Sequence, residues 1–407
     1  MFDDPIIKTK ILEIWTSLMD KIYIPGSLEK YISFLPILII GFVITFVLTP
    51  IIGNIAKKNN IVYVPNVKRK GKKFDNPDKA MHKGIIPALG GLGVMIPIFL
   101  VTLVFFKIDS ITLPLLIALG ILTIGGVLDD IFNLPAKVQF GIQILAALVI
   151  CTSILDLESF TIFGTSIPMD LLKVQPVIGK FAFSLTFPGD LFLLCWLVFC
   201  INSFKWIGGS PGLIEGNALI VTSLIFIISI RHQVLFSSTL SSLIVGSLLA
   251  FLIFAYPPPL IMSGSPGKSV YGLLICTLAL ISQTKFATTL ILLLLPTLDA
   301  IYVVIRRYID YKPKNPLELM KISGTTHFHH RLLKMDTPPQ KVFWIEFGIT
   351  LLIGSLAIVA TGALRYFCLI WGIIFIIAII LLLKLKAAQK ENSKSHKEES
   401  SESKYSY

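Results

Sequence analysis

The chain has 407 residues, of which 54% are hydrophobic, and a mean hydropathy of +0.81. This composition lies far from that of soluble globular domains, so it excludes an ordinary soluble enzyme and indicates an integral membrane protein. The formal net charge is +12, and the positions of the basic residues are more informative than their number because they orient membrane helices.

Apolar stretches of about 20 residues, the length that a helix needs to cross a bilayer, recur along most of the chain. They follow an N-terminal segment, residues 1–30, which has no secretory cleavage pattern and which we expect on the outer side or at the membrane interface. The predicted fold is all-α: a polytopic membrane domain over residues 31–385, followed by a polar, disordered tail over residues 386–407. Eleven spans are predicted, at 31–53, 85–106, 111–128, 138–155, 187–204, 217–231, 234–256, 269–283, 286–305, 343–363 and 366–383.

Basic residues are concentrated in two loops. Residues 54–84 contain nine lysines and arginines and residues 306–342 contain eight, far more than the loops that alternate with them. By the positive-inside rule these loops and the C-terminal tail are cytoplasmic and the N-terminus is outside, in the inner (plasma) membrane. Four polar or glycine-rich segments then fall on the cytoplasmic face and predict an active-site cavity there: 129–130, 208–216, 263–268 and 327–331.

Two adjacent carboxylates, Asp129 and Asp130, stand where the third predicted span ends. Carboxylates are costly at this place because a helix C-terminus itself carries partial negative charge. A bound Mg²⁺ would reverse the sign, and it needs only one or two protein carboxylates when waters and substrate phosphates complete its shell. The pair therefore predicts either a magnesium site or, as the plainer interpretation, a solvated helix end.

The second candidate region is basic. Three histidines and an arginine lie within residues 327–331, beside Arg306 and Arg307, and this pattern favours phosphate binding. A zinc site and a plain basic surface are the competing interpretations. Zinc is disfavoured because no cysteine accompanies the histidines, and all five cysteines lie in apolar stretches typical of core packing.

Two further segments carry weaker signals. Lys137 follows Pro135 at the start of the fourth predicted span, where a lysine either contacts an anionic headgroup or extends along the membrane interface. Residues 202–216, which include Asn202 and Lys205, are rich in glycine and permit close approach of the backbone to a ligand.

Taken together, these segments resemble the polyprenyl-phosphate N-acetylhexosamine-1-phosphate transferases of glycosyltransferase family 4 type. The resemblance covers roughly residues 35–385. The segments that carry it are Asp129-Asp130 with Lys137 and Gln143, the His-x-His-His-Arg-Leu run that begins at His327, the run from His82 to Gly91, and Asp299.

The resemblance implies transfer of a sugar 1-phosphate from a UDP-N-acetylhexosamine to undecaprenyl phosphate, which initiates a cell-envelope polysaccharide. It implies Mg²⁺ as cofactor, with Asp129 and Asp130 as catalytic residues and metal ligands, and leaves open which of the two is ligand and which base. The implied partners are the lipid phosphate, the UDP-sugar and the bilayer, with a homodimer left open and no nucleic acid. The implied substrate-binding residues are Lys137, Asn202, Lys205, His327, His329, His330 and Arg331.

The sequence departs from the family pattern in one direction, because positions that are usually acidic are neutral. They are Val64, Gly208, Pro211, Ser265 and Gly324. Two carboxylates still suffice for Mg²⁺ if a diphosphate supplies further ligands. Lys205, where the family has asparagine, can bind phosphate by its charge.

Three hypotheses follow from this pattern. The first is an active, divergent transferase. The second is a catalytically inactive member of the family that binds lipid phosphate, a nucleotide sugar or a partner protein. The third, more remote, is a lipid or solute transporter, which is disfavoured because the spans carry few ionisable residues in mid-bilayer.

Overall fold

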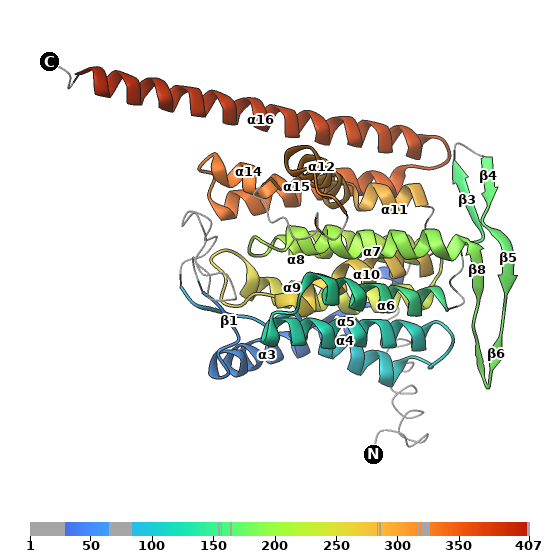
Figure 1. Ribbon diagram of the computed structural model, residues 1–407. Coiled ribbons are helices and arrows are strands. Elements are labelled where there is room, and N and C mark those ends of the chain that lie inside the picture. The colour runs from blue at the N-terminus through green and yellow to red at the C-terminus, as the bar shows by residue number, and fades with distance from the viewer. Residues whose placement is uncertain are drawn as a thin grey trace.

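Long runs of leucine, isoleucine, valine and phenylalanine form helices because a membrane offers backbone groups no water, so each segment satisfies its own hydrogen bonds. The computed structural model describes residues 29–64, 84–153, 155, 157–162, 165–282, 284, 286–315, 318 and 326–404. Its helices are α2 (Glu29–Ile32), α3 (Leu35–Lys58), α4 (Gly91–Phe105), α5 (Thr112–Phe132), α6 (Ala136–Cys151), α7 (Gly189–Ile207), α8 (Leu213–Arg231), α9 (Leu235–Ala255), α10 (Gly264–Ile281), α11 (Phe286–Leu292), α12 (Leu294–Tyr311), α14 (Phe328–Lys334), α15 (Pro339–Val359) and α16 (Leu364–Lys404). They form an all-α bundle in which most helices run along a common direction (Figure 1).

Among the described residues, eight helices are long and apolar enough to cross a membrane: the α2–α3 segment from Lys30, α5, α7, α8, α9, α10, α15 and α16. A ninth span results if α11 and α12, which meet at a bend of 81°, are taken as one. Helices α4 and α6 are apolar but shorter. Each predicted span overlaps one of these elements, but eleven membrane crossings are not confirmed.

The interior of the bundle is formed by α8 and α10. Within their apolar windows 83% and 89% of residues are buried, against 22% in α16. Helix α16 therefore faces outward, while α10 packs against α5, α7 and α4 and positions its first turn at their ends. Helix α12 turns across the direction of the other helices (Figure 1).

Short antiparallel strand pairs join some of the helices. Between α6 and α7, β3 (Ser159–Ile162) pairs with β4 (Thr165–Pro168), β5 (Asp170–Val174) with β8 (Leu185–Pro188), and β6 (Val177–Ile178) with β7 (Phe181–Ala182). They project from one end of the bundle (Figure 1). A further pair, β1 (Val62–Tyr63) and β2 (Ile86–Pro87), precedes α4. The sequence predicted only a loop between α6 and α7.

The predictions for the N-terminal segment and for the C-terminal tail concern the two ends of the chain. Nearly all of the N-terminal segment 1–30 lies outside the described residues. The tail 386–407 was predicted to be disordered, but α16 continues through it as far as Lys404. The tail opens with alanines, lysines and glutamate, which are good helix formers and can extend an existing helix without a new nucleus.

Candidate functional site

The site begins where α5 ends beside the first turn of α10. Gly126 makes this approach possible, because a Cβ at this position would overlap the backbone nitrogen of Pro266. The two helices therefore meet backbone to backbone. Asp129 and Asp130, one turn further along α5, face the start of α10 and are each 7% exposed.

Asp130 caps α10 from another helix. The backbone N–H of Ser265 donates to both carboxylate oxygens of Asp130, with N–O distances of 3.1 Å. The first N–H groups of a helix have no partner within it and carry partial positive charge. The N-terminus of α10 thus offsets the cost of a carboxylate at the C-terminus of α5, and the sequence alone gave no sign of this partner.

Asp129 is held by two side chains. Its Oδ2 accepts a hydrogen bond of 2.6 Å from Ser265 Oγ, and its Oδ1 accepts one of 2.7 Å from Gln139 Nε2 on α6. The other end of the same amide, Gln139 Oε1, accepts a hydrogen bond from Lys205 Nζ on α7. An ammonium, an amide and a carboxylate therefore form a continuous relay, which we call the Lys205 relay.

A small cavity lies at the centre of this arrangement. Its volume is about 10 Å³, roughly the room that one water needs. Asn202 stands beside it, because its Nδ2 donates to Gln143 Oε1 at 2.7 Å. The residues that line the cavity are Leu122, Gly125, Gly126, Asp129, Gln139, Ile142, Gln143, Lys205, Ser265 and Ser269.

The structure thus brings together Asp129, Asp130, Asn202 and Lys205 from the predicted set. Lys137 is exposed and does not line the cavity. Gln139 and the role of Ser265 were missed. Gln139 lies two residues after Lys137 in the segment already singled out, but a neutral amide carries no charge signal in a sequence.

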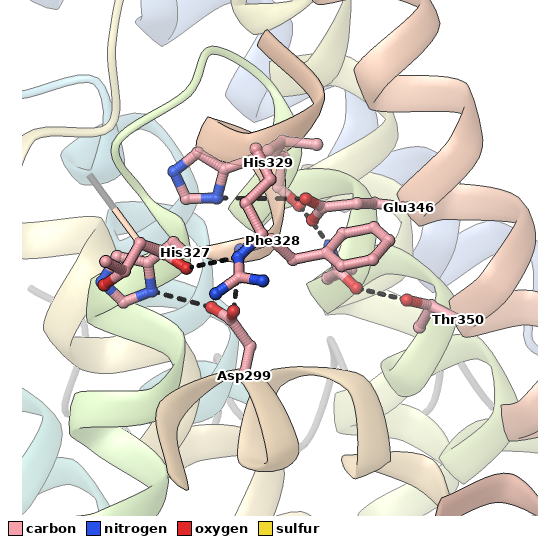
Figure 2. A network of polar contacts seen from close by, with 10 residues as sticks. Asp299, His327, Phe328, His329, Glu346 and Thr350 are labelled. Atoms are coloured by element: carbon pink, nitrogen blue, oxygen red, sulfur yellow. Dashed lines mark hydrogen bonds and ion pairs between the residues drawn. The ribbon is translucent and has the colours of Figure 1, made fainter. Parts of the chain in front are cut away.

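The histidines form a packed cluster around Asp299 of α12 (Figure 2). His327 Nδ1 lies 2.7 Å from Asp299 Oδ2, and the backbone N–H of Phe328 donates to Asp299 Oδ1 at 2.8 Å. Asp299 thereby supports the start of α14 and fixes the ring of His327. The side chains of both Asp299 and His327 are only 5% exposed.

His329 lies deeper and faces Glu346 of α15 (Figure 2). Its Nδ1 is 3.9 Å from Glu346 Oε1, and its ring is stacked on that of His327 with centroids 5.6 Å apart. Burial, and then the neighbouring His330 and His327, lower the pKa of His329 well below its usual value. The cluster therefore favours a neutral imidazole at this position.

Arg331 packs within the protein. Its guanidinium lies over the ring of Tyr302 at 4.3 Å, and its Nε donates to the carbonyl of Thr326. Of the predicted binding residues, His327 and His329 are buried while His330 and Arg331 are half-buried. This part of the cluster resembles a built core more than an open basic surface.

The end of α7 connects the two halves of the site. Lys205 belongs to the relay, and the next residue, Trp206, contacts the histidine cluster, with 6.1 Å between its ring centroid and that of His327. Three residues after Trp206, a Cβ at Gly209 would lie 3.5 Å from His329 Nε2. The aspartate pair and the histidines therefore lie at the same end of the bundle, as the topology predicted.

Two buried acids near this end were not predicted as site residues. Glu215 on α8 accepts a hydrogen bond from Ser263 Oγ and interacts electrostatically with Lys268. Glu346 is 2% exposed within an apolar span. An acid inside a membrane span is a functional signal in any sequence, and by that rule Glu346 was identifiable.

The surroundings of Asp129 and Asp130 bear on the predicted magnesium site. Among the residues that the structure describes, no group of three or more histidine, cysteine, aspartate or glutamate side chains is arranged to hold a metal ion. Asp129 and Asp130 already accept hydrogen bonds from Ser265 and Gln139. Mg²⁺ keeps several waters in its shell, whereas the cavity beside Asp129 has room for about one. The described residues therefore do not fit a magnesium ion.

Comparison with known proteins agrees with the family resemblance of the sequence. Residues 112–283, from α5 to the end of α10, match the family model described as glycosyl transferase family 4. The chain is 27% identical over 362 residues to the probable undecaprenyl-phosphate N-acetylglucosaminyl 1-phosphate transferase of Bacillus subtilis (strain 168), covering 87% of this chain and 91% of the relative.

Two other relatives are more distant. Phospho-N-acetylmuramoyl-pentapeptide-transferase of the same organism is 24% identical, over 68% of this chain and 84% of the relative. Decaprenyl-phosphate N-acetylglucosaminephosphotransferase of Mycolicibacterium smegmatis (strain ATCC 700084 / mc(2)155) is 24% identical, over 75% of this chain and 80% of the relative.

Proposed function

We propose, from the premise that the chain belongs to glycosyl transferase family 4, that it transfers a sugar 1-phosphate from a UDP-N-acetylhexosamine to a polyprenyl phosphate. The observation that carries this proposal is the convergence of α5, α6, α7 and α10 on the Lys205 relay, inside the segment that matches the family model. The relatives' names specify the same acceptor class, a polyprenyl phosphate.

In this reaction an oxygen of the lipid phosphate attacks the phosphorus that carries the sugar. A new phosphoanhydride bond forms, the old one breaks, and UMP leaves with the electron pair. Little covalent chemistry is asked of the protein, so positioning and electrostatic stabilisation dominate. We expect the ammonium of Lys205 to attract phosphate oxygens, with the histidine cluster beside it at the end of α7.

Members of this family generally depend on a metal ion, and the sequence predicted Mg²⁺. The contacts of Asp129 and Asp130 do not support such a site, so we assign no step to a metal. We also propose that the site faces the cytoplasm and that the N-terminus lies outside, because the basic loops adjoin the end of the bundle that carries the relay.

A direct assay tests the function. Purified protein is incubated with radiolabelled UDP-N-acetylglucosamine and undecaprenyl phosphate, and the labelled lipid product is measured. We expect Lys205→Met to lower transfer at least about tenfold, because a charge-assisted contact to phosphate is lost. Asp170→Asn, an exposed change on β5 at the far end of the bundle, is the control and leaves the rate unchanged.

A second candidate function is a catalytically inactive member that binds the lipid phosphate or the nucleotide sugar. The observation that favours it is that both carboxylates of the pair are engaged by protein donors. Binding of UDP-N-acetylglucosamine without any labelled lipid product would support this alternative. Labelled product from the wild-type protein would exclude it.

A further inference from the structure

The carboxylates that a divalent cation would need are already committed within the fold. Asp130 caps α10 through Ser265, and Asp129 accepts from Ser265 and Gln139. A metal ion would have to share these oxygens with the donors that already hold them, including the N–H group that Asp130 caps. The sequence difference lies at the same place, because Ser265 occupies one of the usually acidic positions and contributes a donor instead of a ligand.

A positive charge is already present where a metal would lie. Lys205 Nζ donates to Gln139, which donates to Asp129, and Lys205 lines the same cavity as Asp129 and Ser265. Hydrogen bonds in such a chain polarise one another. A divalent cation beside Asp129 would be repelled by this ammonium across a few ångströms of a poorly solvated interior.

A second ammonium lies on the adjacent helix. Lys268 stands one turn after Ser265 on α10, and its aliphatic chain lies against the position of Gly208, where a Cβ would be 2.9 Å from Lys268 Cγ. Its Nζ is 5.2 Å from the centre of the Tyr63 ring. Two lysines therefore border the region between α7 and α10 with the same total charge as one divalent cation.

We propose that this protein binds the diphosphate of its substrate without a divalent cation, and that the Lys205 ammonium supplies the positive charge. The proposal rests on the proposed function for its substrate class. Its chemistry is that of a fixed cation: the ammonium donates to phosphate oxygens as Gln139 and Asp129 hold it in place. The metal dependence that is general in the family has been replaced by a side chain.

Binding of UDP-N-acetylglucosamine to the detergent-purified protein, measured by calorimetry with EDTA or with Mg²⁺, tests the proposal. We expect the two dissociation constants to agree within about twofold, and Lys205→Met to weaken binding about tenfold in both buffers. Lys341→Met, an exposed lysine in the first turn of α15, is the matched control and leaves binding unchanged.

The outcomes separate the two levels of the argument. Binding that EDTA abolishes and Lys205→Met preserves overturns the fixed-cation proposal but leaves the transferase assignment intact. No binding of UDP-N-acetylglucosamine in either buffer, with no transfer to lipid, overturns the proposed function itself.

A second experiment uses the metal alone. Mn²⁺ is titrated into the protein and the free ion is followed by electron paramagnetic resonance. We expect the wild-type protein to retain no Mn²⁺, and the double variant Lys205→Asn, Ser265→Asp to retain about one ion, because a third carboxylate then joins Asp129 and Asp130. Stoichiometric Mn²⁺ on the wild-type protein contradicts the proposal whatever the double variant does.

A separate cavity lies at the opposite end of the bundle. Helix α7 ends at the relay, so α8, which returns from there, ends at the far side with Arg231. Arg231, His232 and Arg365 line a cavity of about 230 Å³ together with Thr284, Thr288 and Thr361, and no carboxylate is among its lining residues. We call it the Arg365 pocket.

Arg365 is the informative residue in this pocket. Its Nε and Nη1 are buried from solvent and have no hydrogen-bond partner among the residues that the structure describes, whereas Arg231 Nη1 donates to the carbonyl of Ile358. Two buried guanidinium nitrogens without an acceptor are costly, so an anion is expected to meet them. The pocket lies where α15 ends and the outward-facing α16 begins, so a bilayer crossed by both helices would have headgroups near this level.

We infer that the Arg365 pocket binds a phosphate group and that an anionic membrane lipid supplies it. Guanidinium and hydroxyl donors suit phosphate oxygens, and the position beside a lipid-facing helix gives a headgroup direct access. This inference is independent of the transferase site.

Native mass spectrometry of the protein in mixed phosphatidylglycerol and phosphatidylcholine tests this pocket. We expect retained phosphatidylglycerol on the wild-type protein and about tenfold less on Arg365→Gln. Arg306→Gln is the control, because Arg306 lies outside the pocket, on α12, where it pairs with Asp310. Equal retention by wild type and Arg365→Gln overturns the inference. If inorganic phosphate in lipid-free detergent protects the wild-type protein against thermal unfolding but does not protect Arg365→Gln, the pocket takes phosphate from solution. That result would overturn the lipid as the source of the phosphate.

Discussion

At the scale of single residues, the chemistry of the site depends on how each charged group is paired. Asp130 is paired with a helix end, Asp129 with a hydroxyl and an amide, and Asp299 with an imidazole and a backbone N–H. The carboxylates that the sequence emphasised therefore hold helix ends and side chains in place within the fold.

His329 provides a pH-dependent property at this scale. Its pKa is lowered in the folded protein by burial and by His330 and His327, whereas an unfolded histidine has a pKa of about 6.5. The unfolded state therefore binds the proton more readily as the pH falls below that value. We expect stability to be complete above about pH 6.5 and to fall, by up to about 1.4 kcal/mol per pH unit, below it.

Thermal unfolding in detergent between about pH 7.5 and 5.5 measures this effect. His329→Gln should flatten the dependence of the melting temperature on pH. The variant keeps the neighbouring titratable groups Glu346, His327 and His330, so the change reports on His329. Lys341→Gln, an exposed change in the first turn of α15, should keep the wild-type slope. Identical slopes in wild type and His329→Gln would contradict the assignment.

At the scale of elements, the contact between α5 and α10 is decisive because it forms the cap on α10 and because Ser265 of α10 holds Asp129, the last member of the Lys205 relay. Gly126 sets the distance between the two backbones. We expect Gly126→Ala to destabilise the protein by about 1–3 kcal/mol through overpacking and to lower substrate binding as Ser265 moves away from the aspartates.

The same helix offers a matched control. A Cβ at Gly120 would have nothing within 4 Å, so Gly120→Ala should be neutral or slightly stabilising through better helix propensity. Melting temperature and binding of UDP-N-acetylglucosamine are measured for both variants. If the two substitutions behave alike, the close approach of α5 to α10 is not what holds the site.

Much of this arrangement was predictable from the sequence. Hydropathy located the helices, and the positions of Asp129, Asp130 and the histidines at helix ends placed them at one end of the bundle. The partners were not predictable, because the period of a helix says which face is apolar but not which helix it meets. Ser265 is 135 residues from Asp130, and no local pattern links them. The short strands between α6 and α7 were missed for a similar reason, since they lack a buried face.

At the scale of the whole molecule, the charges of the loops predict how the bundle is oriented. The described parts of the two basic segments include β1 and α14, which lie at one end of the bundle, while the strands β3 to β8 lie at the other end (Figure 1). By the positive-inside rule we expect the strands outside the cell and the relay on the cytoplasmic side.

Labelling of single cysteines tests this orientation. In a background whose native cysteines are replaced by alanine, Val174→Cys on β5 should react with a membrane-impermeant maleimide in intact cells. Lys341→Cys should react only after the membrane is opened. Both positions are exposed, so the contrast reports the side of the membrane. Reversed labelling would place the relay outside and remove the basis for a cytoplasmic nucleotide sugar.

The cap on α10 has one more consequence, for ligand discrimination. A soluble anion can bind the N-terminus of α10 only by competing with Asp130, which already accepts from Ser265. Because Asp130 belongs to the same chain, its effective concentration at this helix end is high. A small free anion competes poorly with such a tethered rival. A ligand with several charged groups gains binding free energy from contacts elsewhere in the site. The capped helix end therefore favours large, multiply charged ligands over simple inorganic anions.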